Sequence, residues 1–390
     1  MKKKLVAILG STGSIGKSTL EIIKQYSSFK VFLLTANTNF KEICYQINFF
    51  KPEMALIKNY KTFLKVKEKF KKYDVKICNK FEEIKHTQKK IDYTISATPG
   101  IAGLEPTLNL IKFSNNVLLA NKESIVCGWS LIKNLSKKFK CKLIPIDSEH
   151  FSINQLIKNY PYNQIEKIYI TASGGPFFNL PINEFNKILP KDAIKHPRWN
   201  MGKKISVDSA TLVNKVLEVS EALKIFPFKI NTYKIIVHPE SLIHAIIKLK
   251  NGYSVFLYHL PDMKIPIANA LGCNYSLSKY QNKKKASNID IQNLSFYEID
   301  KKKYPVVNLI PKINITKSSL IVFNASNEIF VEQFLNKNID FVDISRYLRL
   351  IISHKKYMKL SKMKCGNLKQ ILNIDYLARN LCLEILKKHD

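Results

Sequence analysis

The first 150 residues alternate short apolar runs rich in β-branched residues with longer stretches whose apolar side chains recur at helical spacing. Leu20 and Ile23 stand three residues apart in one such stretch, and Phe63, Val66 and Phe70 repeat every three or four residues in another. This alternation predicts an α/β protein whose N-terminal domain, residues 1–150, is a Rossmann-like, doubly wound sheet covered by helices. The strands expected there are 5–9, 31–35, 54–57, 91–97, 117–120 and 143–146.

A second pattern begins at about residue 151. A β-rich run at 167–171 ends in glycines, and the dipeptide Asn251-Gly252 separates two alternating runs at 243–249 and 255–260. Asn-Gly between such runs is a strong hairpin signal, so an antiparallel or mixed sheet is expected. We assign residues 151–280 to a central α+β catalytic domain, with a lid loop near residues 195–204.

The last part of the chain predicts helices. Residues 281–305 have few apolar positions and are expected to form a linker. Residues 306–390 predict a C-terminal helical bundle, in which Asp375 caps a helix that carries Leu377 and Leu381 on one apolar stripe. The helices expected there are 319–336, 343–354 and 375–388.

The chain is strongly basic, because 63 Lys and Arg residues stand against 30 Asp and Glu, a net charge of +33. Such a balance raises nucleic acid as a partner, and a basic nucleic-acid-binding protein is the non-enzymatic alternative. Arginine, which recognition of bases and phosphates favours, is however rare, and the lysines are spread through every segment. We therefore expect no nucleic-acid partner and only a diffuse attraction for phosphorylated small molecules.

Targeting and membrane signals are weak in this sequence. No apolar stretch approaches the roughly 18 residues that a membrane span needs, so no membrane partner is expected. The short apolar run after the N-terminal lysines passes directly into glycines, which favours a first strand over a signal peptide. Seven scattered cysteines without a CxxC pair are typical of a reducing compartment and give no sign of a zinc cluster. These features predict a cytoplasmic protein.

A glycine-rich loop, Gly10 to Gly16, follows the first strand and precedes a helical stretch. Glycines there allow a tight turn and close approach of a pyrophosphate, and the helix N-terminus attracts the anion. A turn that binds nothing is the alternative, whereas a Walker P-loop is excluded because Ser11 stands where that motif needs glycine. The second strand ends in Asn37, Thr38 and Asn39, without the carboxylate that would bind the ribose of NAD, which favours NADP.

Two carboxylates, Asp147 and Glu149, follow the sixth expected strand. If this segment is extended, residues i and i+2 face the same way, and the two acids converge. Hard oxygen ligands suit Mg²⁺ or Mn²⁺, although neighbouring acids after a strand also mark the start of a helix. A third acid, Glu218, is placed to join them on a cation.

A polar cluster precedes Glu218 in the sequence. Ser209 suits an N-cap, and Asn214, Lys215 and Glu218 stand at i, i+1 and i+4 on the helix expected after it. A hydroxyl, an amide, an ammonium group and a helix N-terminus together make a phosphate cradle. An ordinary capped helix with a solvated polar face is the alternative, but it leaves the turn Ser173-Gly174-Gly175 unexplained.

The segment from His196 to Gly202 combines a titratable side chain with Trp199 between turn residues. Loops of this kind serve as lids that exclude water, and a surface loop with a packed Trp is the alternative. The chain lacks a GxSxG elbow at the Ser173 turn, which makes a serine nucleophile improbable.

Taken together and in this order, these segments closely resemble the 1-deoxy-D-xylulose 5-phosphate reductoisomerase family over nearly the whole chain. The motifs that carry the resemblance are Gly10-Ser-Thr-Gly-Ser-Ile-Gly16, Leu119-Ala-Asn-Lys-Glu-Ser124, Pro145-Ile-Asp-Ser-Glu-His150, Ser173-Gly-Gly-Pro-Phe177, His196-Pro-Arg-Trp-Asn-Met-Gly202 and Lys204-Ile-Ser-Val-Asp-Ser-Ala-Thr211 with Asn214-Lys215 and Glu218. The resemblance implies a homodimeric, NADPH-dependent and metal-dependent enzyme. It would rearrange 1-deoxy-D-xylulose 5-phosphate and reduce the resulting aldehyde to 2-C-methyl-D-erythritol 4-phosphate, a precursor of isoprenoids.

The resemblance also implies roles for individual residues. The cofactor would be held by Thr12, Gly13, Ser14, Ile15, Asn37, Thr38, Asn39, Asn121, Glu123 and Gly202. One Mg²⁺ or Mn²⁺ would be bound by Asp147, Glu149 and Glu218. The substrate would contact Lys122, Ser148, Glu149, Ser173, His196, Ser209, Asn214, Lys215 and Glu218. Of these, Lys122, Glu149 and His196 would be catalytic.

Two departures from the family pattern stand out. Family members commonly carry a basic loop such as Gly-Lys-Asn where this chain has Asn37-Thr38-Asn39, so weaker selectivity for NADP over NAD is expected. Pro99, in the segment Ala97-Thr98-Pro99-Gly100, is also unexpected and should reshape a loop on the cofactor side, because proline fixes φ and lacks an N–H.

A semialdehyde dehydrogenase on a similar nucleotide domain is the enzymatic alternative. Such an enzyme needs an activated thiol, for which Cys127 is the nearest candidate, but no basic partner for it is evident in the sequence. It would also have no use for three converging acids.

Overall fold

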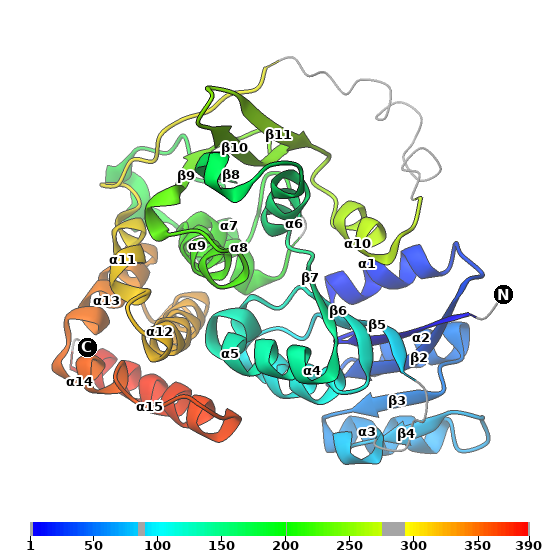
Figure 1. The fold of residues 1–390 in the computed structure, drawn as a ribbon. Coiled ribbons are helices and arrows are strands. Elements are labelled where there is room, and N and C mark those ends of the chain that lie inside the picture. The colour runs from blue at the N-terminus through cyan, green and yellow to red at the C-terminus, as the bar shows by residue number, and fades with distance from the viewer. Residues whose placement is uncertain (1–2, 85–89, 200, 275–292, 389–390) are drawn as a thin grey trace. The chain divides into compact units, whose positions relative to one another are not determined.

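The computed structural model describes residues 3–84, 90–199, 201–274 and 293–388 (Figure 1). The chain forms two compact units, one of Met1–Asp147 with Met263–Tyr280 and one of Ser148–Asp262 with Gln281–Asp390. Residues 281–292 of the expected linker and position 200 of the expected lid lie outside the described residues.

The first unit is built on a parallel sheet of seven strands, in the order β4-β3-β2-β1-β5-β6-β7. Its strands are β1 (Lys4–Leu9), β2 (Phe29–Ala36), β3 (Met54–Ile57), β4 (Lys76–Cys78), β5 (Ile91–Ser96), β6 (Ser114–Leu119) and β7 (Lys142–Pro145). The predicted doubly wound sheet is therefore confirmed. The strand order reverses beside β1, and ligands bind at such switch points outside the carboxyl ends of the strands. The glycine loop that follows β1 starts at this point.

Helices cover the sheet and complete its core. They are α1 (Ser14–Ile23), α2 (Phe40–Phe50), α3 (Tyr60–Lys69), α4 (Leu104–Ile111), α5 (Lys122–Phe139) and α10 (Lys264–Leu271). The last of these returns from a distant part of the sequence, because Ile267 and Leu271 enter the same core cluster as Leu20 and Ile23 of α1. At the edge of this contact, Nζ of Lys264 forms an ion pair with Oε2 of Glu21 at 2.6 Å.

The second unit contains a mixed sheet of four strands in the order β11-β10-β8-β9. These are β8 (Ile165–Ala172), β9 (Tyr233–Val237), β10 (Ile243–Leu249) and β11 (Ser254–Tyr258). β8 and β9 are parallel, while β10 pairs antiparallel with both β8 and β11. The predicted hairpin is confirmed, with Gly252 at a φ of 93° in its turn.

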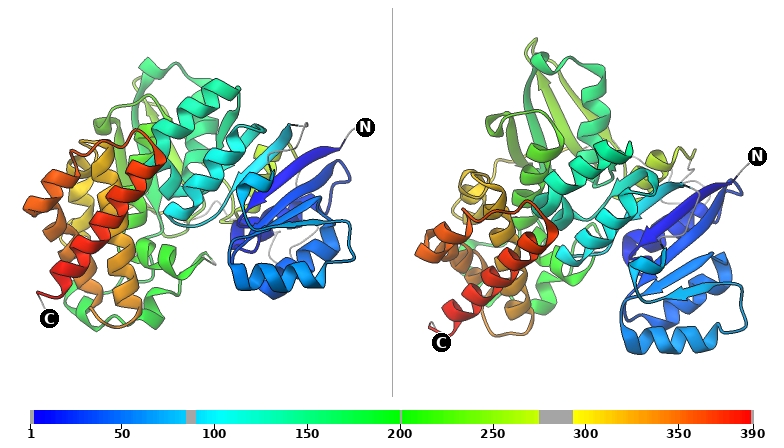
Figure 2. Two further views of the ribbon diagram at one scale, coloured as in Figure 1. Left: turned by 90° about the horizontal axis from the view of Figure 1, so that it is seen from below. Right: turned by 60° about the horizontal axis from the view of Figure 1, so that its bottom comes forward.

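The other regular elements described in the second unit are helices, and the predicted C-terminal bundle is confirmed (Figure 2). Its helices are α6 (Ser148–Leu156), α7 (Pro190–Ala193), α8 (Lys203–Ala210), α9 (Val213–Ile225), α11 (Ile310–Ile313), α12 (Lys317–Leu335), α13 (Phe341–Ser353), α14 (Lys355–Leu360) and α15 (Leu368–Leu386). The expected cap at Asp375 is wrong. α15 begins earlier, with Asn367 accepting the N–H of Gln370 at 2.9 Å, and the buried Asp375 instead binds Arg379 at 2.7 Å.

Candidate active site

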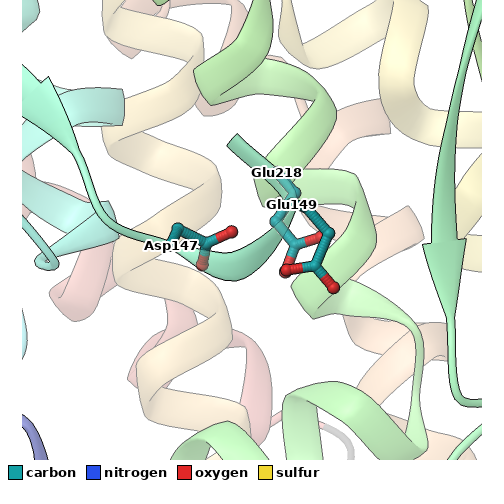
Figure 3. A group of neighbouring side chains, drawn as sticks. All are labelled: Asp147, Glu149 and Glu218. Carbon is teal, nitrogen blue, oxygen red and sulfur yellow. The ribbon is translucent and has the colours of Figure 1, made fainter. Parts of the chain in front are cut away.

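Three carboxylates converge in the structure, two of them close in the sequence and the third about 70 residues later (Figure 3). One oxygen from each of Asp147, Glu149 and Glu218 lies within 4.8 Å of the others. Asp147 follows β7, Glu149 lies in the first turn of α6, and Glu218 lies on α9. The Glu218 side chain is almost fully buried and the Asp147 side chain is the most exposed of the three, at 16%. Buried carboxylates close together repel one another unless a cation compensates them, and such oxygens are the ligands that Mg²⁺ and Mn²⁺ prefer.

The expected geometry of the first two acids is wrong, although they do converge. Glu149 does not lie in an extended segment, because α6 begins at Ser148. The hydroxyl of Ser148 donates to Oε2 of Glu149 at 2.6 Å. The segment is thus both a helix start and part of an acidic cluster, so the two interpretations of this motif are compatible.

Two lysines neutralise the acidic cluster. Nζ of Lys215 lies 2.5 Å from Oε1 of Glu149 and 2.6 Å from Oε2 of Glu218. Burial alone would lower the Lys215 pKa, but the two carboxylates outweigh it and raise the pKa above its ordinary value. Lys122, at the start of α5, forms an ion pair with Asp147. The site therefore holds positive charge against each of the three acids.

The polar cluster around Ser209 is arranged differently from the prediction. Ser209 is not an N-cap, since it lies in the last turn of α8, and α9 begins only after Leu212, whose φ of 61° turns the chain. Asn214, Lys215 and Glu218 do share one helix, where the amide of Asn214 donates to Oε1 of Glu218 at 2.5 Å.

The turn after β8 brings Ser173 to His196. Gly174 and Gly175 both have positive φ, and a side chain on Gly175 would meet the backbone of Ser209 and Ala210. Nε2 of His196 lies 2.9 Å from the Ser173 hydroxyl, which also accepts the N–H of Gly175 at 3.1 Å. The structure thus places Ser173, His196 and the end of α8 in one neighbourhood.

The imidazole of His196 is held in one tautomer by its own loop. Its Nδ1 accepts the backbone N–H groups of Arg198, at 3.2 Å, and Trp199, at 2.9 Å. Burial lowers the pKa of His196 to about 4, and the charge of Lys215 adds to the effect. Neutral His196 therefore carries its hydrogen on Nε2, where it donates to Ser173.

The rest of the expected lid packs on the same unit. The Trp199 ring meets His244 edge-on, with centroids 5.9 Å apart, and the Arg198 guanidinium donates to the carbonyl of Pro239 at 3.2 Å. Gly202 is the residue that precedes α8.

The predicted nucleotide loop lies at the N-terminus of α1. Gly13 precedes the helix, and Gly13 and Ser14 are exposed, while Thr12 and Ile15 are partly buried. A side chain on Gly16 would come within 2.5 Å of the Ser11 Cα, so this glycine lets the helix pack directly on the loop. The N–H groups of the first turn are thus presented at the switch point of the sheet, as a bound pyrophosphate requires.

The residues expected on the adenosine side lie at the end of β2. Asn37, Thr38 and Asn39 are all exposed. Oδ1 of the Asn39 side chain accepts the backbone N–H of Glu42 at 3.2 Å, so this side chain caps α2. No carboxylate is among them, in line with the preference for NADP.

Asn121 and Glu123 lie at the start of α5 and are buried. The Asn121 amide donates to the carbonyls of Thr98 and Gly100, and to Glu123 at 3.3 Å. The loop that contains Pro99 is therefore fastened to α5 through Asn121. Cys127, the candidate thiol of the dehydrogenase alternative, is 4% exposed on the same helix.

Comparison with known proteins decides the family. Models of 1-deoxy-D-xylulose 5-phosphate reductoisomerase match residues 6–128, and models of its C-terminal domains match residues 143–226 and 259–381. A protein of that name from Pelagibacter ubique is 44% identical over 96% of this chain and 98% of its own length. The chain belongs to this family. A Wolbachia reductoisomerase from Brugia malayi is 36% identical, over 98% of both chains.

Solved structures of reductoisomerases agree. A crystal structure of the enzyme with NADPH, fosmidomycin and magnesium has a TM-score of 0.89 at 29% identity, covering 98% of both chains. The Zymomonas mobilis reductoisomerase with NADPH has a TM-score of 0.86 at 30% identity, covering 99% of both. The membership makes this protein an oxidoreductase of isoprenoid precursor synthesis and confirms the resemblance seen in the sequence.

Two residues that support this reductoisomerase site, Gln46 and Lys303, carry no recognisable signal in the sequence. Gln46 of α2 is buried, and its amide donates to the carbonyl of Ser11 in the glycine loop at 2.9 Å. Lys303 donates to the carbonyl of Leu180 at 2.6 Å, in the loop that follows the Ser173 turn. A buried polar residue on a helix resembles any other polar residue in a sequence, so only the fold reveals these contacts.

Proposed function

We propose that the residues described above perform the reaction of the family, the NADPH-dependent rearrangement and reduction of 1-deoxy-D-xylulose 5-phosphate to 2-C-methyl-D-erythritol 4-phosphate. The observation that carries this proposal is the convergence of Asp147, Glu149 and Glu218 with Lys122 and Lys215. An acidic cluster that needs cations, in a member of a family crystallised with magnesium, supports a metal site.

The donor set fits a divalent metal. The three residues would hold Mg²⁺ or Mn²⁺ through hard oxygen ligands. When bound, the ion supplies positive charge to oxygens of the substrate as its carbon skeleton rearranges, worth several kcal/mol. Lys122 sits beside Asp147 and adds positive charge at the same place, or delivers a proton there.

The substrate phosphate would be held by Ser173, Ser209, Asn214 and Lys215. The Ser173 hydroxyl oxygen already accepts two hydrogen bonds, from His196 Nε2 and from the Gly175 N–H. Its own hydrogen is therefore available to donate to a phosphate oxygen. His196 acts in this arrangement as a neutral donor that orients Ser173, and it lines the reacting end with Ser148.

NADPH would be bound by the loop residues Thr12, Gly13, Ser14 and Ile15, with further contacts from Asn121, Glu123 and Gly202. The exposed α1 N-terminus supports this assignment, because its N–H groups lie at the switch point where α/β sheets bind pyrophosphates. Asn37, Thr38 and Asn39 would border the adenosine ribose.

We propose further that the enzyme is a cytoplasmic homodimer. All seven cysteines, each within the described ranges, are free thiols, which fits a reducing compartment. In the second unit, Phe256 on the edge strand β11 is 47% exposed, and Tyr253, the residue before this strand, is exposed as well. Exposed aromatics on an edge strand favour pairing with a second copy. Sedimentation of wild type and of Phe256→Lys tests this, since a dimer would dissociate in the variant.

Among the helices that the structure describes, none combines the length and the apolar character that a membrane span requires.

The decisive experiment follows NADPH absorbance with 1-deoxy-D-xylulose 5-phosphate, first with Mg²⁺ and then with EDTA. Turnover that disappears on chelation and returns with added metal supports the proposal. Folded protein that turns over in neither condition contradicts it. Cys127→Ser is the matched test of the dehydrogenase alternative, and retained turnover excludes a thiol mechanism.

A further inference from the structure

A buried pair of side chains joins the C-terminal bundle to α8, the helix that carries Ser209 of the proposed phosphate cradle. The amide of Asn327, on α12, donates to Oδ1 of Asp208, on α8, at 2.7 Å. Both residues belong to the second unit and lie 119 positions apart in the sequence. Asn327 is 0% and Asp208 2% exposed, so the bond is shielded from water.

Asp208 is a buried carboxylate, and the Asn327 amide supplies a hydrogen bond to one of its oxygens. Its other oxygen, Oδ2, is 2.9 Å from Nζ of Lys204, whose side chain is 31% exposed. This ion pair joins residues one turn apart on α8, so it neutralises the Asp208 charge within the helix itself. Asn327 provides the attachment of Asp208 to a different part of the fold, through a hydrogen bond to a buried charged group.

The attachment acts where α8 meets the substrate groups. Ser209 directly follows Asp208, and the last turn of α8 lies against Gly175, where an added Cβ would stand 2.9 Å from the Ala210 Cα. Gly175 in turn donates its N–H to the Ser173 hydroxyl. A shift of α8 away from α12 would therefore move Ser209 and disturb the Ser173 turn together.

The bend between α8 and α9 links the position of α8 to that of α9. Thr211 donates to the carbonyl of Val207 at 3.0 Å, and its hydroxyl accepts the N–H of Val213 at 3.4 Å. The end of α8 and the beginning of α9, which carries Asn214 and Lys215, are thus joined by a short, hydrogen-bonded bend.

We propose that Asn327 is a positioning residue for the substrate's phosphate: by holding Asp208 it keeps Ser209 of α8 in register with Ser173 and with Lys215 on α9. The inference rests on the proposed function, because it takes these residues to be the phosphate ligands. Within the described ranges Asn327 forms no hydrogen bond to any of these residues, so its effect should fall on phosphate binding and not on the chemical step.

The test compares Asn327→Ala with Asn324→Ala. Asn324 lies on the same helix and is also 0% exposed, but its amide donates at 3.1 Å to Glu328 within α12. Both variants remove one buried amide from α12, so a general loss of stability affects both. The measurements are KM and kcat for 1-deoxy-D-xylulose 5-phosphate, KM for NADPH, and the Kd of inorganic phosphate by calorimetry.

We expect Asn327→Ala to raise KM for the sugar phosphate and the Kd of inorganic phosphate on the order of tenfold, as a lost cluster of phosphate contacts would. KM for NADPH should change less than about twofold, and Asn324→Ala should leave phosphate binding at the wild-type level. The exchange variant, Asp208→Asn with Asn327→Asp, restores one donor and one acceptor and should recover part of the loss. Equal phosphate affinity in the Asn327 and Asn324 variants would overturn the inference.

The calorimetry separates this inference from the proposed reaction. If wild-type protein binds inorganic phosphate but does not turn over the substrate, the proposed reaction is contradicted. Weaker phosphate binding by Asn327→Ala than by wild type would in that case still support the positioning role. Wild-type turnover with an unchanged KM in Asn327→Ala would contradict the positioning role alone.

Discussion

The ammonium group of Lys215 lies 2.5 Å from Oε1 of Glu149 and 2.6 Å from Oε2 of Glu218, two of the three acids proposed to bind the metal. The lysine therefore pairs with two of the carboxylates that a divalent cation would use. If a metal bound these acids, the Lys215 ammonium group would be released for the substrate phosphate, as proposed above. Metal binding and Lys215 would then be coupled, because they compete for the same carboxylates.

The first prediction concerns this competition. Lys215→Met removes the charge that neutralises Glu149 and Glu218, so Mn²⁺ measured by calorimetry without substrate should bind on the order of tenfold more tightly. The variant should also unfold at a lower temperature in EDTA and recover with Mg²⁺, because unpaired buried carboxylates destabilise the fold. Lys224→Met, farther along α9, is the control. Weaker Mn²⁺ binding in Lys215→Met would show that the lysine does not compete.

The second prediction concerns pH. Burial, with a smaller effect of Lys215, lowers the His196 pKa from 6.5 to about 4, so the unfolded chain binds this proton more tightly than the native protein. The stability contributed by neutral His196 is therefore complete above about pH 6.5 and is lost as the pH falls towards about 4. Urea denaturation should show a steeper fall in unfolding free energy for wild type than for His196→Gln over this window. Parallel curves would contradict it.

The third prediction tests the nucleotide loop. A methyl group at Gly16 would lie 2.6 Å from the carbonyl oxygen of Gly10 and 2.5 Å from the Ser11 Cα, and both are backbone atoms that cannot step aside. Gly16→Ala should therefore weaken NADPH binding at least tenfold in a fluorescence titration and cost about 1–3 kcal/mol of stability. Gly366→Ala, where the nearest atom is 3.6 Å away, is the matched control. Unchanged NADPH binding would argue that the pyrophosphate lies elsewhere.

The fourth prediction concerns the choice between NADPH and NADH. The exposed end of β2 carries no lysine among Asn37, Thr38 and Asn39, so the 2′-phosphate has a weaker partner there than in a relative with a basic loop. Thr38→Lys should raise the ratio of kcat/KM for NADPH over NADH several-fold, with the larger effect at low salt. Tyr45→Lys, on the exposed face of α2, controls for the added charge. A wild-type ratio equal to that of a lysine-bearing relative would refute the idea.

Local signals in the sequence were sufficient for much of the fold. Short, continuous apolar runs between helical stretches predicted six strands of the parallel sheet, because these strands are buried and apolar along most of their length. The short strand β4 was missed, since its three residues are too few to show a period. Asp375 was misread as a cap because an acid before an apolar stripe looks the same in a helix interior, where it pairs with Arg379.

The site divides in the same way. The acids, the glycine loop and the segment from His196 to Gly202 could be singled out as candidates from residue types and spacing, because ligand chemistry limits which side chains serve. How Glu149 meets Glu218, which carboxylates Lys215 binds, and that α10 completes the core of the first unit depended on contacts between residues far apart in the chain. The sequence by itself therefore determined the family and the chemical groups available. Only the tertiary structure decided their pairing, because hydrogen bonds and ion pairs depend on distances that packing sets and that no local pattern encodes.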